Sequence, residues 1–177
     1  ALSHLDAPSC DLHVAREGIK HWQHWMPKYV SSASYIGGRS DMITALIDPI
    51  IGYGRDDLSP EIPILKRTFN MSFLCGINQF TSYIPFTDYN VKEHQDFSDY
   101  VARVSMMLRG AKSEASIAMY YPIETFHATS LANDKGHGVV LFTNKENEAT
   151  LSFMASSLLD QGMDYNFITS EAIQEAS

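Results

Sequence analysis

Basic residues are scarce in this chain of 177 residues. Lys and Arg together number 13 against 21 Asp and Glu, which gives a formal net charge of −8 at pH 7. Proteins that bind nucleic acid rely on clustered basic side chains to neutralise phosphates, and here those side chains are few and scattered. The composition therefore argues against nucleic acid as a partner.

Long apolar stretches are also missing. No uninterrupted apolar run approaches the roughly 20 residues that span a bilayer, and the first residues, ALSHLDAPSC, lack the basic end and apolar centre of a signal peptide. We therefore expect no membrane partner. The compartment stays open, because a targeting segment can precede the first residue given.

Cysteine occurs twice, at Cys10 and Cys75, and the two positions show no disulfide-framework spacing, so they predict free thiols. The stretch HWQHW places His21 and His24 three residues apart, where they can share one face of a helix. No third ligand of recognisable spacing accompanies them. The sequence therefore predicts no metal site and no cofactor.

The chain does contain 45% hydrophobic and 11% aromatic residues, which is a globular composition. Three segments have the pattern of short strands covered on both faces. They are residues 29–36 (YVSSASYI), 41–47 (DMITALI) and 77–84 (INQFTSYI). Between the last two, Leu65, Phe69 and Phe73 recur at helical spacing, and Gly76 ends the helix. A strand, a helix and a strand without a hairpin signal predict a parallel crossover unit.

The remaining chain alternates helices and strands. Phe97, Val101, Val104 and Leu108 form one apolar stripe of a helix that ends at Gly110. From about residue 112 a new α/β unit begins. Its predicted strands are ASIAMYYPI, GVVLF and DYNFIT, and its predicted helices are NEATLSFMASSLLDQG and SEAIQEAS. We therefore divide the chain into residues 1–111 and 112–177.

Both parts look unfinished. A (β/α)8 barrel needs about 250 residues, and an open parallel sheet of three strands leaves an unpaired edge. Four stretches, in order, carry a likeness to a known family: HWQHWMPKYVSSASYIGGR, ITALIDPIIGYG, SPEIPILKRTFNMSFLCGINQFTSYIPF and FSDYVARVSMMLRGAKSEASIAMYYPIETF. They resemble the late part of large bacterial glycoside hydrolases related to the β-galactosidase and α-L-rhamnosidase barrel enzymes. The resemblance covers most of residues 22–126 and returns in LLDQGMDYNFITSEAI.

The resemblance implies an α/β fold in two parts. Residues 1–111 would be the last three βα units of a (β/α)8 barrel, and residues 112–177 would be part of a flavodoxin-like domain. The chain would then be a fragment or incomplete copy of a longer enzyme. Its protein partners would be the remainder of that enzyme or other subunits, including further copies of the same chain.

In such enzymes the strand before a Gly-aromatic-Gly turn ends in a Ser/Thr-Glu pair whose glutamate is the nucleophile. This chain reads Thr44-Ala45 there, followed by Gly52-Tyr53-Gly54, so the resemblance places Ala45 at the nucleophile position. Retaining hydrolysis needs two carboxyl groups about 5 Å apart. The partner acid would lie on an earlier strand outside this chain. The resemblance therefore implies a carbohydrate-binding protein that is inactive as written.

Aromatic rings and amides suit sugars, because the rings contact apolar sugar faces and the amides contact hydroxyls. The resemblance assigns sugar binding to five residues near predicted strand ends: Ser32, Tyr35, Tyr53, Asn78 and Tyr83. The periodicity of the sequence alone equally favours a packing role for each of these five residues. Four acidic residues after the strand are candidates to replace the missing carboxylate: Asp48, Asp56, Asp57 and Glu61. The simpler interpretation is that these acidic side chains are solvated in a loop and at the start of a helix.

Three functions are therefore in competition. The leading hypothesis is a fragment of a retaining glycoside hydrolase that acts on carbohydrate. The second is a non-catalytic sugar-binding or scaffold protein descended from such an enzyme. The third is an unrelated small α/β domain whose alternation of strands and helices resembles that family by coincidence.

Overall fold

The computed structural model describes residues 2–15, 18–19, 25–49, 60–129 and 145–176, and it has a mixed α/β fold. The chain forms two compact units, Ala1–Glu114 and Ala115–Ser177. In the parts described, no helix is long and apolar enough to cross a membrane.

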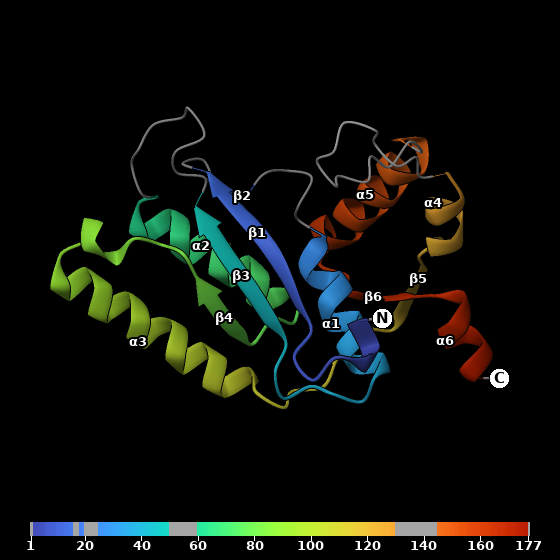
Figure 1. Ribbon diagram of the computed structural model, residues 1–177, viewed down its shortest axis with the longest axis horizontal. Coiled ribbons are helices and arrows are strands. Elements are labelled where there is room, and N and C mark those ends of the chain that lie inside the picture. The colour runs from blue at the N-terminus through green and yellow to red at the C-terminus, as the bar shows by residue number, and fades with distance from the viewer. Residues whose placement is uncertain (1, 16–17, 20–24, 50–59, 130–144, 177) are drawn as a thin grey trace. The chain divides into compact units, whose positions relative to one another are not determined.

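The first unit is built on a mostly parallel sheet (Figure 1). Its strands lie in the spatial order β2-β1-β3-β4, with β1 parallel to β3, β3 parallel to β4, and β2 antiparallel to β1. The strands are β1 (Ser9–Ala15), β2 (Gly18–Ile19), β3 (Thr44–Pro49) and β4 (Gln79–Ser82). The connecting and following helices are α1 (Met26–Ile36), α2 (Ile62–Leu74) and α3 (Val91–Leu108), with short 3-10 turns at Leu2–His4 and Phe86–Asp88.

One face of this sheet is apolar and packs against helices. Alternate residues of β1 and β3 are buried there, because successive side chains of a strand point to opposite faces. The buried strand residues are Leu12, Val14, Ala45 and Ile47. Phe69 and Phe73 of α2 pack on Phe80 of β4, with ring centroids 4.3 Å and 5.0 Å apart. Figure 1 shows α2 behind the strands.

Local sequence explains where α2 and α3 begin and end. Pro63 lies in the first turn of α2, where its missing N–H removes no helical hydrogen bond. Gly76 follows the helix with φ of 95°, a left-handed conformation that favours glycine. Helix α3 begins with a capping box, in which the side chain of Asn90 accepts from the N–H of Glu93 and the Glu93 carboxylate accepts from the N–H of Asn90.

The prediction of a strand at residues 29–36 is wrong, because these residues belong to helix α1. The first of the three parallel strands is instead β1, about 20 residues earlier in the chain. The predictions of two further strands and two helices in this unit are confirmed: β3 and β4 are parallel, α2 lies between them, and α3 follows β4. Leu65, Phe69 and Phe73 lie in the core as predicted.

The second unit contains a two-stranded parallel sheet, β5 next to β6. Its elements are β5 (Ile117–Tyr120), α4 (Ile123–Thr129), α5 (Lys145–Asp160), β6 (Tyr165–Ile168) and α6 (Ser170–Glu175). The predictions of β5, α5, β6 and α6 are confirmed, and α4 was not predicted. The strand predicted in GVVLF lies outside the described residues.

Aromatic residues dominate the interior of the second unit. Phe126 of α4 stacks on Tyr121 with centroids 5.2 Å apart, and Tyr121 makes an edge contact with Phe167 of β6. Tyr165 is fully buried, and Met119 is also inside. These contacts join α4 to the pair of strands.

Candidate functional site

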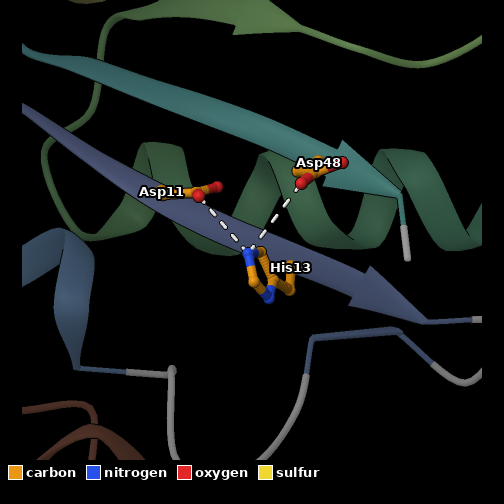
Figure 2. Close-up of side chains that lie close together, drawn as sticks. All are labelled: Asp11, His13 and Asp48. Atoms are coloured by element: carbon orange, nitrogen blue, oxygen red, sulfur yellow. Dashed lines mark hydrogen bonds and ion pairs between the residues drawn. The ribbon is translucent and has the colours of Figure 1, made fainter. Parts of the chain in front are cut away.

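Asp11, His13 and Asp48 converge on the sheet of the first unit (Figure 2). The Nε2 atom of His13 lies 3.3 Å from Oδ2 of Asp11 and 3.9 Å from Oδ2 of Asp48. One ligand atom from each of the three side chains lies within 4.8 Å of the others. The arrangement gathers two carboxylates and an imidazole at one point.

Strand geometry accounts for this convergence. Asp11 and His13 are two residues apart on β1, so they share a face of the sheet, opposite to the apolar core. The parallel register places His13 directly opposite Asp48 on β3. Their side chains are 49%, 40% and 35% exposed for Asp11, His13 and Asp48 respectively, so solvent and solutes reach the cluster.

The cluster lies toward the carboxyl ends of the parallel strands. In open α/β sheets and in βα barrels, ligands bind outside these ends. The backbone N–H of Tyr83 donates to the carbonyl oxygen of Ile47 at 3.0 Å, which continues the register of β4 beyond its last residue. Tyr83, with 69% of its area exposed, therefore lies beside Asp48 at the same end of the sheet.

The other predicted sugar-binding residues lie elsewhere. The side-chain oxygen of Asn78 accepts from the N–H of Ile43 at 2.9 Å, and its amide donates to the carbonyl oxygen of Ser40 at 2.8 Å. Asn78 thus fixes the start of β3, at the amino end of the strands. Asp48 is four positions after Thr44, the first residue of β3, or about 13 Å farther along the strand.

Two of the predicted residues belong to α1, and one lies outside the described residues. Ser32 is buried and its hydroxyl donates to the carbonyl oxygen of Lys28 at 2.5 Å. The hydroxyl of Tyr35 is close to Gly76, where an added Cβ would lie 3.2 Å from it. The structure therefore brings only Tyr83 of the predicted set to the Asp11–His13–Asp48 cluster, and Tyr53 is not described.

Ala45 is fully buried within the apolar core. It lies opposite Cys10 of β1 and Phe80 of β4 in the register. Its methyl group is on the face of β3 that packs against helices, while Asp48 is on the other face. A nucleophile role for position 45 stays a prediction, and in this sheet a longer side chain there meets apolar neighbours.

The pKa of the Cys10 thiol is raised to about 12, first by burial and then by the nearby negative charge of Asp11, with a smaller contribution from Cys75. Neither cysteine forms a disulfide. A thiol with such a pKa is protonated at neutral pH, so Cys10 is a poor nucleophile. It is therefore a packing residue behind the cluster.

Sequence reasoning missed Asp11 because β1 itself was not predicted. The signal was present in the alternation of Cys10, Leu12 and Val14 with polar residues, a pattern typical of a half-buried strand. Asp48 was a candidate carboxylate, and it is the last but one residue of β3. Asp56 and Asp57 lie outside the described residues, and Glu61 is the exposed N-cap of α2.

Comparisons of this chain with protein-family models, with curated proteins and with solved structures find no match. The relationship to glycoside hydrolases therefore stays a prediction from the sequence.

Proposed function

We propose that this chain is a carbohydrate-binding portion of a glycoside hydrolase, formed by the last three βα units of a (β/α)8 barrel and part of a flavodoxin-like domain. Support for the barrel comes from the chain order of its strands. β1, β3 and β4 are neighbours in space in the order of the sequence and all run the same way, with helices between them. A barrel repeats this arrangement around its whole circumference, and each half of a doubly wound sheet contains three strands in such an order as well.

The observation that carries the proposal is the Asp11–His13–Asp48 cluster at the carboxyl ends of these strands. In a barrel the face opposite the helices is the inner face, and the carboxyl ends surround the active site. Carboxylates accept hydrogen bonds from neighbouring sugar hydroxyls, and the exposed ring of Tyr83 offers an apolar surface for a sugar face. The sugar therefore lies against Asp48 and Tyr83.

The proposed protein binds carbohydrate and hydrolyses it slowly or not at all. Hydrolysis with retention needs a pair of carboxyl groups in defined roles. Position 45, where the resemblance expects the nucleophile, holds an alanine buried among apolar side chains. Binding is therefore the property to measure first.

The test is a titration of the chain with a panel of monosaccharides and aryl glycosides, in which NMR chemical shifts report binding. We expect shifts at Tyr83 and around Asp48, and weaker binding in the Tyr83→Ala and Asp48→Asn variants. Asp96→Asn is the matched control, because Asp96 is an exposed residue of α3 paired with Lys92. An absence of binding to every sugar, or binding that both variants leave unchanged, rejects the proposal and favours an unrelated α/β domain.

A further inference from the structure

We propose that Asp11, His13 and Asp48 bind a divalent transition-metal cation such as Mn²⁺ or Zn²⁺. The site occupies the sheet end where the sugar is proposed to bind, but the geometry of its three side chains stands without the sugar. Two neighbouring strands hold the donors in fixed register, with His13 opposite Asp48 and Asp11 two residues before His13. The site is therefore a property of the sheet itself.

The spacing of the donors is close to that of metal ligands. Bonds of about 2.1 Å that meet at tetrahedral or octahedral angles place two ligand atoms about 3.0–3.4 Å apart. The distance from His13 Nε2 to Asp11 Oδ2 is 3.3 Å, and that to Asp48 Oδ2 is 3.9 Å. The distance from His13 to Asp48 has to shorten by about 0.5 Å for both side chains to bind the same ion.

The donor types select the class of cation. Calcium and magnesium ions prefer ligand sets made of oxygen, whereas imidazole nitrogen suits zinc, iron, copper and nickel, and carboxylates accept manganese as well. Two carboxylates and one imidazole favour a transition metal of intermediate hardness. The two negative charges also neutralise the dication, which a cluster of neutral side chains cannot do.

Three protein ligands leave coordination positions open. All three side chains are at least a third exposed, so water or a solute hydroxyl reaches the bound ion. If the proposed function is right, two adjacent hydroxyls of the sugar complete the coordination. The cation would then hold the sugar between the cluster and the ring of Tyr83.

The first test uses the wild-type chain and Mn²⁺ alone. Electron paramagnetic resonance measures the free Mn²⁺, and we expect one ion bound per chain. In NMR spectra the paramagnetic ion should broaden the ring signals of His13 before those of His127, an exposed histidine of α4. Absence of binding at millimolar Mn²⁺, or equal broadening of every histidine, overturns the proposal and leaves His13 as an ion-pair partner of the two carboxylates.

The second test compares variants. Asp11→Asn, His13→Gln and Asp48→Asn should each weaken Mn²⁺ binding at least about tenfold, since even groups that only orient a ligand contribute that much. Asp96→Asn and His127→Gln are matched controls and should bind as the wild type does. Circular dichroism verifies that each variant is folded. Unchanged binding in the folded cluster variants, or tighter binding of Ca²⁺ than of Mn²⁺ and Zn²⁺, also overturns the proposal.

Failure of this inference and failure of the proposed function give different results. Sugar binding by protein treated with a chelator supports the carbohydrate proposal and shows that a cation is not needed for that binding. Metal binding by a protein that binds no sugar supports the cation site alone.

Discussion

His13 of β1 lies directly opposite Asp48 of β3, and its Nε2 atom is 3.9 Å from the Asp48 carboxylate. This pairing joins two segments 35 residues apart, and it depends on the register of two parallel strands. A shift of one residue would move one partner to the opposite face. The cluster with Asp11 is therefore as well defined as the sheet, and residues that fix the start of β3 also fix the cluster.

Asn78 is one such residue. It is buried, and it bonds both to Ile43 and to Ser40. We expect Asn78→Ala to lower the free energy of unfolding by about 2–3 kcal/mol, because it leaves a buried backbone N–H and a carbonyl without partners. Urea denaturation measures the loss.

The matched control for this prediction is Asn70→Ala, which removes an exposed amide of α2 whose oxygen accepts an exposed hydrogen bond from the hydroxyl of Tyr100 on α3. Its expected cost is below about 1 kcal/mol, because exposed groups regain hydrogen bonds to water. If instead Asn78→Ala keeps full stability but loses sugar binding, Asn78 contacts the sugar directly.

Gly76 is required by the turn between α2 and β4. Its φ is 95°, and an added Cβ would lie 2.7 Å from Cβ of Ser31 on α1. We expect Gly76→Ala to cost about 2–4 kcal/mol, the sum of a left-handed backbone penalty and overpacking. Gly38 has φ of 69°, and an added Cβ there would meet nothing within 4 Å, so Gly38→Ala should cost only about 1–2 kcal/mol. Equal thermal midpoints for both variants would contradict this explanation.

The titration of Cys10 makes stability depend on pH. Its pKa is raised from 9.0 to about 12 by folding, first through burial and then through the charge of Asp11. The folded state therefore keeps a proton that the unfolded state loses between pH 9 and 12, so this contribution to stability is complete below pH 9 and is lost as pH rises toward 12. We expect the difference in unfolding free energy between wild type and Cys10→Ala to shrink over this range.

Cys75→Ala removes the other thiol of the chain, which adds a smaller contribution to the raised pKa of Cys10, so this variant should keep most of the pH dependence. If the wild type and Cys10→Ala differ by a constant amount from pH 8 to pH 11, Cys10 does not have a raised pKa. Slow alkylation of Cys10 in the folded protein at pH 9, and rapid alkylation after unfolding in urea, are expected as well, because burial both raises the pKa and restricts access of the reagent.

The sequence predicted much of the fold where the hydrophobic pattern had two clear faces. The stripe of α3 from Phe97 to Leu108 and the spacing of Leu65, Phe69 and Phe73 in α2 were sufficient for both helices. Helix α1 was mistaken for a strand because it is buried at most positions, including several serines. A helix surrounded by protein shows no polar stripe, and its aromatic and β-branched residues then favour a strand.

The candidate site was harder to predict than the fold. Asp11 and His13 share a face once β1 is known, but their meeting with Asp48 depends on which strand pairs with β1 and in which register. A single sequence does not contain this information, because any register that keeps the same face buried satisfies the alternation. Which face of the sheet Ala45 occupies likewise depends on which strands pair and in which register.

The burial of Ala45 gives a test of the nucleophile position. Its methyl group lies in the apolar core, so we expect Ala45→Glu to lower the free energy of unfolding by about 3–5 kcal/mol, through a buried charge without a partner and through overpacking. Thr81→Glu is the matched control on an exposed position of β4, and its cost should be below about 1 kcal/mol. Urea denaturation of both variants measures the difference.

The pH dependence of the same variant distinguishes a buried carboxyl from an active one. Burial raises the pKa of a glutamate above its unfolded value of about 4.3, so the folded variant prefers the protonated acid. The penalty relative to wild type should therefore be largest at neutral pH and should shrink as pH falls toward 4. An Ala45→Glu variant that is as stable as the wild type and hydrolyses aryl glycosides would instead show that position 45 faces the sugar, because a glutamate can then supply the attacking oxygen of a retaining hydrolase.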